Sequence, residues 1–326
     1  MDVRQIKPGT QMHLKWLAAN GIVYNAYKNN SWADLDLSSV VGAHRCLVLL
    51  KIDKAALYAV QARTNGDTAD FTRGISISSA GAIDDYLLVL TDANGVIEWF
   101  TQAGIGQATT VTIIGYAFCL YSGAQVYSDN PSNTWTDVDL GVGQCLALLK
   151  VVAGGNTEIR ARPDGETLFG AAATGCSQAQ GLTNGKACYI IVPTDSLGII
   201  EVIGQQSLVI TLEGYVVDAV WESTQIANGD SSLAWSDVQI SGKGAGLALI
   251  KATTTDNVGG VNGILRRNGD SVSSSVIGNF GLAPVGAGEQ TAYALVMTDA
   301  NGKFEEISTI GAANRIYTLL TFIPDP

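Results

Sequence analysis

The sequence is poor in the residues from which most catalytic and metal sites are built. Its 326 residues include only two histidines, His13 and His44, and five cysteines with no Cys-x-x-Cys spacing. So few histidines nearly exclude a histidine-built zinc or iron site and leave little for a Ser-His or Cys-His nucleophile. We therefore expect no metal, no cofactor and no catalytic residues, and we do not expect an enzyme.

Basic residues are also scarce, because 19 Lys and Arg stand against 30 Asp and Glu, for a net charge of −11. A nucleic-acid binder needs a basic surface to displace counterions, so we expect no nucleic-acid partner. No apolar run approaches the roughly 20 residues that span a bilayer, and we expect no membrane association. Residues 1–7 open no apolar segment of a signal peptide, so export by a Sec-type signal is not expected.

What the sequence does contain is an internal triplication. The pattern T-D-x-x-G-x-[IF]-E occurs at residues 91–98, 194–201 and 298–305. Three other patterns recur in the same order: W-x-D-[LV]-x-[LI] from Trp32, L-x-L-[LI]-K ending at Lys51, and R-x-[ND]-G-[DE] from Arg63. The spacing of roughly 100 residues is near the commonest domain size. The boundaries predict a leading arm at residues 1–18 and repeats at residues 19–118, 119–217 and 218–326.

Each repeat contains seven or eight short apolar runs separated by turn signals, which predicts an all-β fold of three tandem β-sandwiches, jelly-roll or immunoglobulin-like. The run Leu47 to Leu50 is apolar at consecutive positions, which is typical of a strand buried on both faces. We expect such a strand to have a neighbouring domain on its outer face. The very short linkers favour fixed packing of the repeats but leave open a row or a pseudo-threefold ring.

The cysteines are predicted to be structural. Cys46 and Cys145 occupy matched positions before the leucine-rich strands, and we interpret both as small core residues. Cys176 and Cys188 could pair within the second repeat, but a disulfide framework would recur in the other copies and does not.

The T-D-x-x-G segments predict hairpin turns. Asp92, Asp195 and Asp299 can accept hydrogen bonds from backbone N–H groups two residues on, and the glycine tolerates the left-handed conformation. A calcium loop is the alternative, but the oxygen ligands are few and Leu197 replaces asparagine in the second copy. The glutamates that end the pattern are predicted to be solvated or paired strand residues.

The R-x-[ND]-G-[DE] segments predict exposed two-residue hairpins that carry a local ion pair. A repeated contact loop is the alternative interpretation. The residues concerned are Arg63, Asp67, Arg162, Glu166, Arg266 and Asp270.

The tryptophans fit the fold less simply. Strand alternation places each tryptophan on the polar face, together with the aspartate two residues on. Each indole either plugs the end of its sandwich or packs on the next repeat, or it forms a stacking platform for a sugar ring or a partner protein. The candidate contact residues are Trp32, Asp34, Trp135, Asp137, Trp235 and Asp237.

The leading arm is locally basic, with Arg4, Lys7, His13 and Lys15 against one acid, Asp2. Such an arm could lie along the acidic surface of a neighbouring subunit, which would make the protein a homo-oligomer.

Over residues 20–326 the four repeated segments resemble, in style, the tandem β-sandwich virion proteins of tailed phages, which decorate capsids or form head spikes and tail fibres. The resemblance implies a structural or attachment protein of a virion, released by cell lysis. It also implies assembly with other virion proteins and contact with a host-surface glycan. The alternative function is a multivalent, lectin-like carbohydrate-binding protein whose three weak sites are the tryptophans.

Overall fold

The computed structural model describes most of the chain. The described residues are 14–16, 21–26, 31–54, 60–68, 70–71, 83–101, 109–118, 120–167, 176–217, 220–230, 233–254, 262–271, 279–281, 290–308 and 314–325. Within them the chain is almost entirely β-strand, and the single helix, α1 (Ser38–Val41), has four residues. No helix of the described part is long and apolar enough to cross a membrane.

The described strands form six sheets, which make three pairs. In each pair, the sheet with the longer strands is called here the large sheet and the other the small sheet. In the first repeat the large sheet contains β1 (Leu14–Trp16), β2 (Ile22–Ala26), β4 (Cys46–Lys54), β7 (Ile83–Leu90) and β9 (Thr109–Phe118). Its small sheet contains β3 (Ala33–Asp36), β5 (Val60–Thr64) and β8 (Val96–Thr101).

The second and third repeats follow the same plan. The second has β10 (Leu120–Asp129), β12 (Leu146–Ala153), β15 (Lys186–Pro193) and β17 (Leu208–Val216) in its large sheet, and β11 (Thr136–Asp139), β13 (Thr157–Pro163), β14 (Gln178–Leu182) and β16 (Ile199–Gly204) in its small one. The third has β18 (Val220–Asp230), β20 (Gly246–Thr254), β23 (Gln290–Thr298) and β25 (Asn314–Pro324), with β19 (Ser236–Gln239), β21 (Asn262–Arg267), β22 (Asn279–Gly281) and β24 (Lys303–Ser308). The predicted three tandem β-sandwiches are confirmed.

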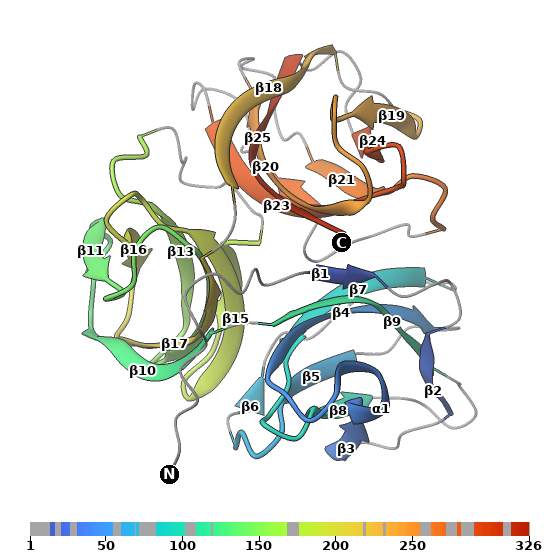
Figure 1. Cartoon of the computed structure of the whole chain (residues 1–326). Helices are drawn as coiled ribbons and strands as arrows, with labels where there is room; N and C mark the ends of the chain where they lie inside the picture. Colours follow the sequence, from blue (N-terminus) through green and yellow to red (C-terminus); the bar gives the residue numbers. More distant parts are fainter. Residues whose placement is uncertain are drawn as a thin grey trace.

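The three sandwiches form a closed ring around a common centre (Figure 1). Their large sheets face inward, with β1, β7, β15 and β23 close to the centre, while the small sheets lie on the outside. The first and second repeats are also joined through backbone, because β6 (Asp70–Phe71) of the first pairs in parallel with β15 of the second. Of the two arrangements that the short linkers permit, the chain therefore adopts the ring.

The ring is held by a hydrophobic core that all three repeats share, called here the central core. Its buried members are Leu47, Leu49, Tyr86, Leu88, Leu90, Ala117, Leu146, Leu148, Cys176, Ile191, Val216, Leu247, Leu249, Tyr293, Leu295, Met297 and Ile323. Each sandwich has a separate core between its own two sheets. Because burial of apolar surface is the main driving force of folding, the central core binds the repeats into one body.

Strand β4 shows how one sequence serves both cores. Leu47 and Leu49 point into the central core, whereas Val48 and Leu50 point into the core of the first sandwich. Successive side chains of a strand alternate between faces, so a strand that is apolar at every position can be buried on both. The expected burial of this run against a neighbouring domain is confirmed.

The first repeat begins earlier than the sequence suggests. In β1, Trp16 pairs with Gly115, just as Tyr121 pairs with Gly214 and Trp221 with Thr321 in the later repeats. β1 and β2 together thus correspond to the continuous strands β10 and β18, and residues 14–16 belong to the sandwich rather than to an arm. The remaining arm residues, including Arg4, Lys7 and His13, lie outside the described residues.

Candidate functional sites at the repeat interfaces and on the outer sheets

Each interface of the ring contains the same ion pair between a lysine and a carboxylate. Lys150 Nζ lies 2.6 Å from Asp67 Oδ1, Lys51 Nζ lies 3.0 Å from Asp270 Oδ1, and Lys251 pairs with Glu166. The lysine is the last residue of the L-x-L-[LI]-K motif of one repeat, and the acid ends the R-x-[ND]-G-[DE] turn of the preceding repeat in the ring. The second repeat thus reaches the first, the third reaches the second, and the first reaches the third.

A tyrosine donates to the same carboxylate at every interface; Tyr86 and Tyr293 are buried and Tyr189 is half-buried. Tyr189 Oη lies 3.5 Å from Asp67 and Tyr293 Oη lies 3.4 Å from Glu166. Tyr86 donates to Asp270. Burial is the largest cause that raises the pKa of all three tyrosines, so their hydroxyls remain donors at neutral pH.

The sequence predicts exposed turns with an ion pair inside each turn, but the turn acids are largely buried and pair with another repeat. The side chain of Asp67 is 11% exposed and that of Glu166 is 12% exposed, and both bind a lysine of another repeat. Such head-to-tail contacts between unlike surfaces close into a ring only when the rotation per unit fits, as it does here. The acids of this motif therefore contribute to ring assembly.

The arginines of the same turns bind within their own repeat. The Nε atoms of Arg63, Arg162 and Arg266 lie 2.7, 2.8 and 2.9 Å from the carboxylates that end the T-D-x-x-G-x-[IF]-E pattern. Those carboxylates belong to Glu98, Glu201 and Glu305. The expectation that they are paired strand residues is confirmed.

Each of these arginines also covers a tryptophan. The guanidinium carbon lies 4.0 Å from the ring centroid of Trp32, 3.9 Å from that of Trp135 and 3.7 Å from that of Trp235. Such cation–π contacts are worth about 0.5–2 kcal/mol each. One face of each half-buried indole is thus occupied by a side chain of the same sandwich, and a sugar could stack only on the other face.

The aspartates beside the tryptophans remain exposed. Asp34 lies directly opposite Glu98 across the strand pair, and Asp137 lies opposite Glu201. In the third repeat Asp237 is compensated by Lys303, whose Nζ lies 2.9 Å away. Like charges directly opposite one another destabilise a sheet, so these positions bear a cost that the core packing does not explain.

The predicted T-D-x-x-G turn is confirmed in all three copies. Asp92 Oδ1 accepts from the backbone N–H groups of Asn94 at 2.8 Å and Val96 at 2.9 Å. The third-repeat turn glycine, Gly302, has a φ of +74°, and a Cβ there would lie 2.3 Å from the carbonyl oxygen of Lys243. Backbone donors thus occupy the carboxylate oxygen that a calcium loop would need.

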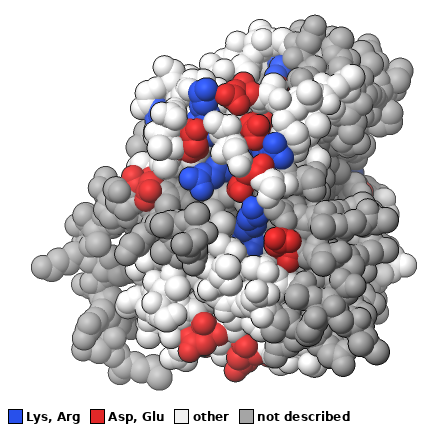
Figure 2. Space-filling view, turned by 90° about the vertical axis from the view of Figure 1, so that its right-hand side faces the viewer, with Lys and Arg blue, Asp and Glu red and all other residues white. Residues whose placement is uncertain are grey.

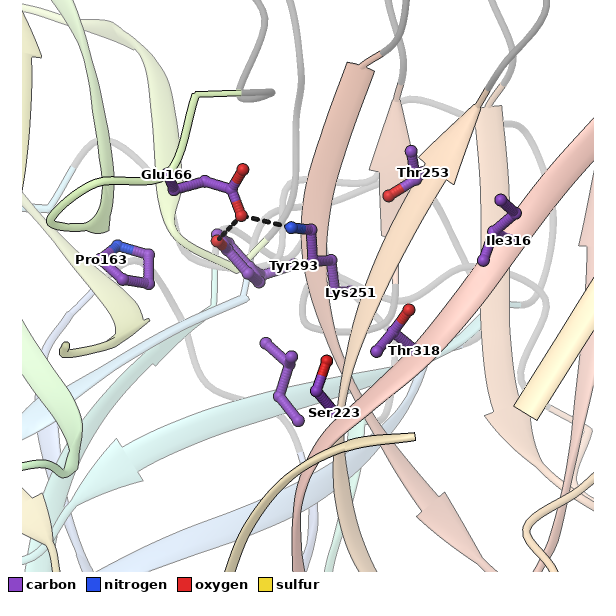
Figure 3. A pocket seen from close by; sticks show the side chains of 9 residues that line it. Pro163, Glu166, Ser223, Lys251, Thr253, Tyr293, Ile316 and Thr318 are labelled. Atoms are coloured by element: carbon purple, nitrogen blue, oxygen red, sulfur yellow. Dashed lines mark hydrogen bonds and ion pairs between the residues drawn. The ribbon is translucent and has the colours of Figure 1, made fainter. Parts of the chain in front are cut away.

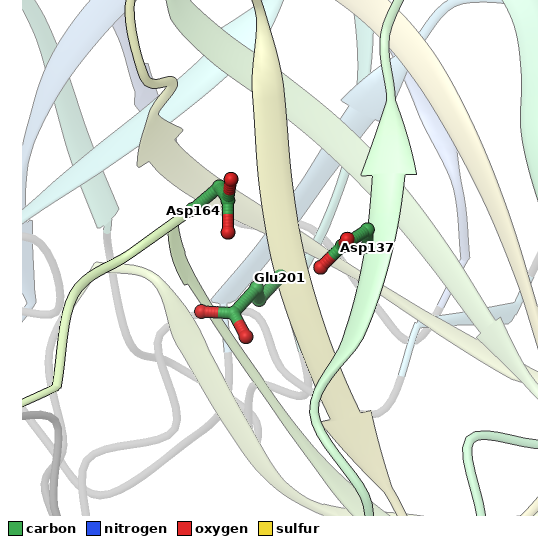
Figure 4. A group of neighbouring side chains, drawn as sticks. All are labelled: Asp137, Asp164 and Glu201. Atoms are coloured by element: carbon green, nitrogen blue, oxygen red, sulfur yellow. The ribbon is translucent and has the colours of Figure 1, made fainter.

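The second repeat differs at one turn position. Asn65 donates to Asp92 at 3.0 Å and Asn268 donates to Asp299 at 2.9 Å, but Asp164 stands at the matching position. As a result the carboxylates of Asp137, Asp164 and Glu201 lie within 4.8 Å of one another (Figure 4). Glu201 already pairs with Arg162, and both aspartates are exposed, so we assign no metal to this group.

A cleft of about 310 Å³ opens where the second repeat meets the third. Its floor is the face of the third large sheet that is turned toward the second repeat, with Thr253, Thr318 and Ile316 on neighbouring strands (Figure 3). The pair formed by Glu166 and Lys251 stands at its wall. The cleft therefore combines hydroxyl groups, one ion pair and a narrow apolar strip.

Charged side chains of both signs are intermixed on the face that Figure 2 shows. Among the described residues of that face, no extended area of basic charge is visible.

The four cysteines that lie in the described part of the chain are buried. Cys46 and Cys145 are 0% exposed in the cores of their own sandwiches, so their predicted role as core residues is confirmed. Burial raises the pKa of the Cys46 thiol to about 12 and that of Cys145 to about 11, which leaves both unreactive near neutral pH. Cys176 lies in the central core and Cys188 in the second sandwich core, and Cys176 carries a free thiol.

Comparisons with known protein families, sequences and structures do not place this chain in a known family. No protein-family model matches the chain, and no curated protein sequence matches it. One solved structure, the X-ray structure of the entire lipid-containing bacteriophage PM2, aligns over 95% of this chain and 86% of that chain with 8% identity. The TM-score of 0.12 is too low to establish a shared fold, and we base no argument on it.

Proposed function

We propose that the chain is a non-enzymatic structural or attachment protein of a phage-like virion, in which it acts as a single-chain equivalent of a trimer. The observation that carries the proposal is the closed ring of three homologous sandwiches. Three ion pairs of one type and one central core join the repeats. A monomer built in this way has the symmetry of a homotrimer without requiring association.

A rigid, pseudo-threefold body suits a position of local threefold symmetry on a particle. Each of its outer sheets carries the same half-buried tryptophan under an arginine, with an exposed aspartate beside it. Three equal contacts to a symmetric partner would add their affinities through effective concentration, so each contact can be weak. The partners in this proposal are other virion proteins, and the exposed aspartates are the side chains available to them.

The test is to locate the protein in its source. Antibodies raised against the recombinant chain should label particles in culture lysates by immunogold electron microscopy, and the chain should co-sediment with those particles. If the chain stays entirely in the soluble fraction and labels no particle, the virion assignment is wrong. A matched variant with Asp34, Asp137 and Asp237 changed to Asn should fold normally but bind particles less.

A second candidate function is glycan binding, and the hydroxyl-lined cleft favours it. Saccharides are recognised through hydroxyl and carboxylate groups, which the cleft offers in Ser223, Thr318 and Glu166. Ser223→Trp should fill the cleft and abolish binding on a glycan array, while Ser128→Trp, at an exposed serine of β10, should not. Equal binding by both variants would exclude the cleft as the glycan site.

A further inference from the structure

The three interfaces differ at one position that faces the ion pair. Strands β9, β17 and β25 pair with the leucine-rich strands β4, β12 and β20, and each contains a bulge of one extra residue at the same place. The bulge lies opposite the steps Leu49–Leu50, Leu148–Leu149 and Leu249–Ile250. The extra residue is Ile114 in the first repeat, Glu213 in the second and Leu320 in the third. Ile114 and Leu320 pack against the central core, so a carboxyl group at this position stands out.

Leu320 shows where this position points. It lines the same cleft as Glu166, Lys251 and Tyr293, which are the acid, the lysine and the tyrosine of its interface. By the repeat symmetry, Glu213 faces Asp67, Lys150 and Tyr189. Charge interactions of Glu213 with Lys150 and Asp67, and of Tyr189 with Glu213, agree with this placement.

The ion pair beside Glu213 brings an amine and a carboxyl group, the two parts of an amide, into direct contact. Lys150 Nζ lies 2.6 Å from Oδ1 and 2.7 Å from Oδ2 of Asp67, so the amine nitrogen sits close to the carboxyl carbon between them. The two side chains are only 17% and 11% exposed, which limits competing water. Holding a nucleophile beside an electrophile removes the entropic cost of bringing the two groups together.

We propose that Lys150 and Asp67 condense to an isopeptide bond, with Glu213 as the proton shuttle, which joins the first and second repeats covalently. The neutral amine of Lys150 attacks Cγ of protonated Asp67, and the N–C bond forms as the tetrahedral intermediate develops. One carboxyl oxygen of Asp67 then leaves as water. The ammonium and carboxylate of the ion pair become one neutral amide and one water molecule, so atoms and charge balance without an oxidant or a co-reactant.

Glu213 is suited to carry the protons of this step. Burial raises its pKa and Asp67 raises it further, while Lys150 and Arg45 act in the opposite direction. A carboxyl group with a raised pKa can give a proton to the departing oxygen and take one from the amine. Ile114 and Leu320 cannot do so, which confines the reaction to one interface and makes the other two internal controls.

The test is the mass of the purified full-length chain. The wild type should weigh one water molecule less than its sequence, and a tryptic digest should contain a branched peptide joining Asp67 to Lys150. Lys150→Arg retains the ion pair but cannot form this amide, so its mass should equal that of its sequence. Lys251→Arg, the matched change at the next interface, should leave the lost water and the branched peptide in place.

Two further variants test the role of Glu213. Glu213→Leu introduces the third-repeat residue and Glu213→Gln preserves the shape, and both should fold and show the full mass. The proposed bond would be refuted by a wild type of full mass. It would also be refuted if the lost water maps to another place, for example to a succinimide at Asp164-Gly165. A branched peptide that forms unchanged in both Glu213 variants would overturn the shuttle.

Discussion

The third sandwich contains a buried charge cluster whose removal gives a sharp test of how the repeats tolerate polar cores. Glu306 is 1% exposed and Arg315 is 9% exposed. Arg315 Nε lies 2.6 Å from Glu306 Oε2, and Tyr317 donates to the same carboxylate. Arg315 Nη1 also donates to the carbonyl oxygen of Gly229 at 2.9 Å, so the cluster connects β18, β24 and β25.

The second repeat fills the same three positions with apolar residues. The register of the strands matches Glu306 to Val202, Arg315 to Leu208 and Tyr317 to Ile210. All three second-repeat residues are fully buried. The same three core positions are therefore filled by a hydrogen-bonded charge cluster in the third repeat and by apolar side chains in the second.

Glu306→Val alone should destabilise the third sandwich by about 3–5 kcal/mol, because it leaves the Arg315 charge buried without its partner. The triple variant Glu306→Val, Arg315→Leu, Tyr317→Ile should be far milder, from neutral to about 1–4 kcal/mol more stable, because it removes both charges from the low-dielectric interior. The single change should lower the melting temperature by at least about 6 °C at roughly 2–4 °C per kcal/mol.

Both variants can be compared by urea denaturation followed by circular dichroism, with differential scanning calorimetry to separate the sandwiches if they unfold independently. Val202→Glu in the second repeat, which places a lone acid in a hydrocarbon core, is the reverse control and should also destabilise. If the single and triple variants lose the same stability, the reasoning about an uncompensated charge is wrong.

Three further predictions concern the turns. Asp164→Asn should stabilise the second repeat by about 0.5–1.5 kcal/mol, since it restores the hydrogen bond that Asn268 makes in the third; an unchanged urea midpoint would contradict this. Gly302→Ala should destabilise far more than Gly269→Ala, because both have positive φ but only the first would bring a Cβ within 2.3 Å of a carbonyl oxygen; thermal melts with equal losses would refute it. For Asp299, burial opposes ionisation but hydrogen bonds from Lys303 N–H, Asn268 and Asn301 outweigh it and lower the pKa. The contribution of Asp299 to the free energy of unfolding should be fully present above its pKa in the unfolded chain, about 3.9, and should be lost as the pH falls through its lower pKa in the folded protein. Asp299→Asn should therefore make the free energy of unfolding depend less on pH in the acid range.

The sequence was sufficient for the sandwiches because their signals are local. Apolar alternation, turn glycines and turn aspartates act within a few residues, and the structure shows Asp92 and its counterparts in the predicted role. The start of the first repeat was missed because its strand is divided between β1 and β2, whereas β10 and β18 are continuous. An aromatic residue at the matched position, Trp16, Tyr121 and Trp221, was the signal that could have found it.

The contacts between motifs were not predictable in the same way. Trp235 and Arg266 each lie in a recognised motif, but their stacking depends on how β19, β24 and β21 align side by side. The same holds for the ring, in which Lys150 and Asp67 come from different repeats. A repeated lysine and a repeated acid without local partners were nevertheless a usable sign that each repeat binds the next.

Residues repeat in this chain for two reasons, the folding of each sandwich and the contact between sandwiches. Residues that recur three times serve either a single sandwich, as the turn aspartates do, or the contact between sandwiches, as the lysines and turn acids do. Residues that break the repeat, Asp164, Glu213 and Glu306, lie in one copy each and alter a turn, an interface and a core. Because a pseudo-symmetric ring needs none of these departures in order to close, they are the positions at which the three copies have acquired separate properties, and Glu213 is the one that stands beside a pair of groups able to react.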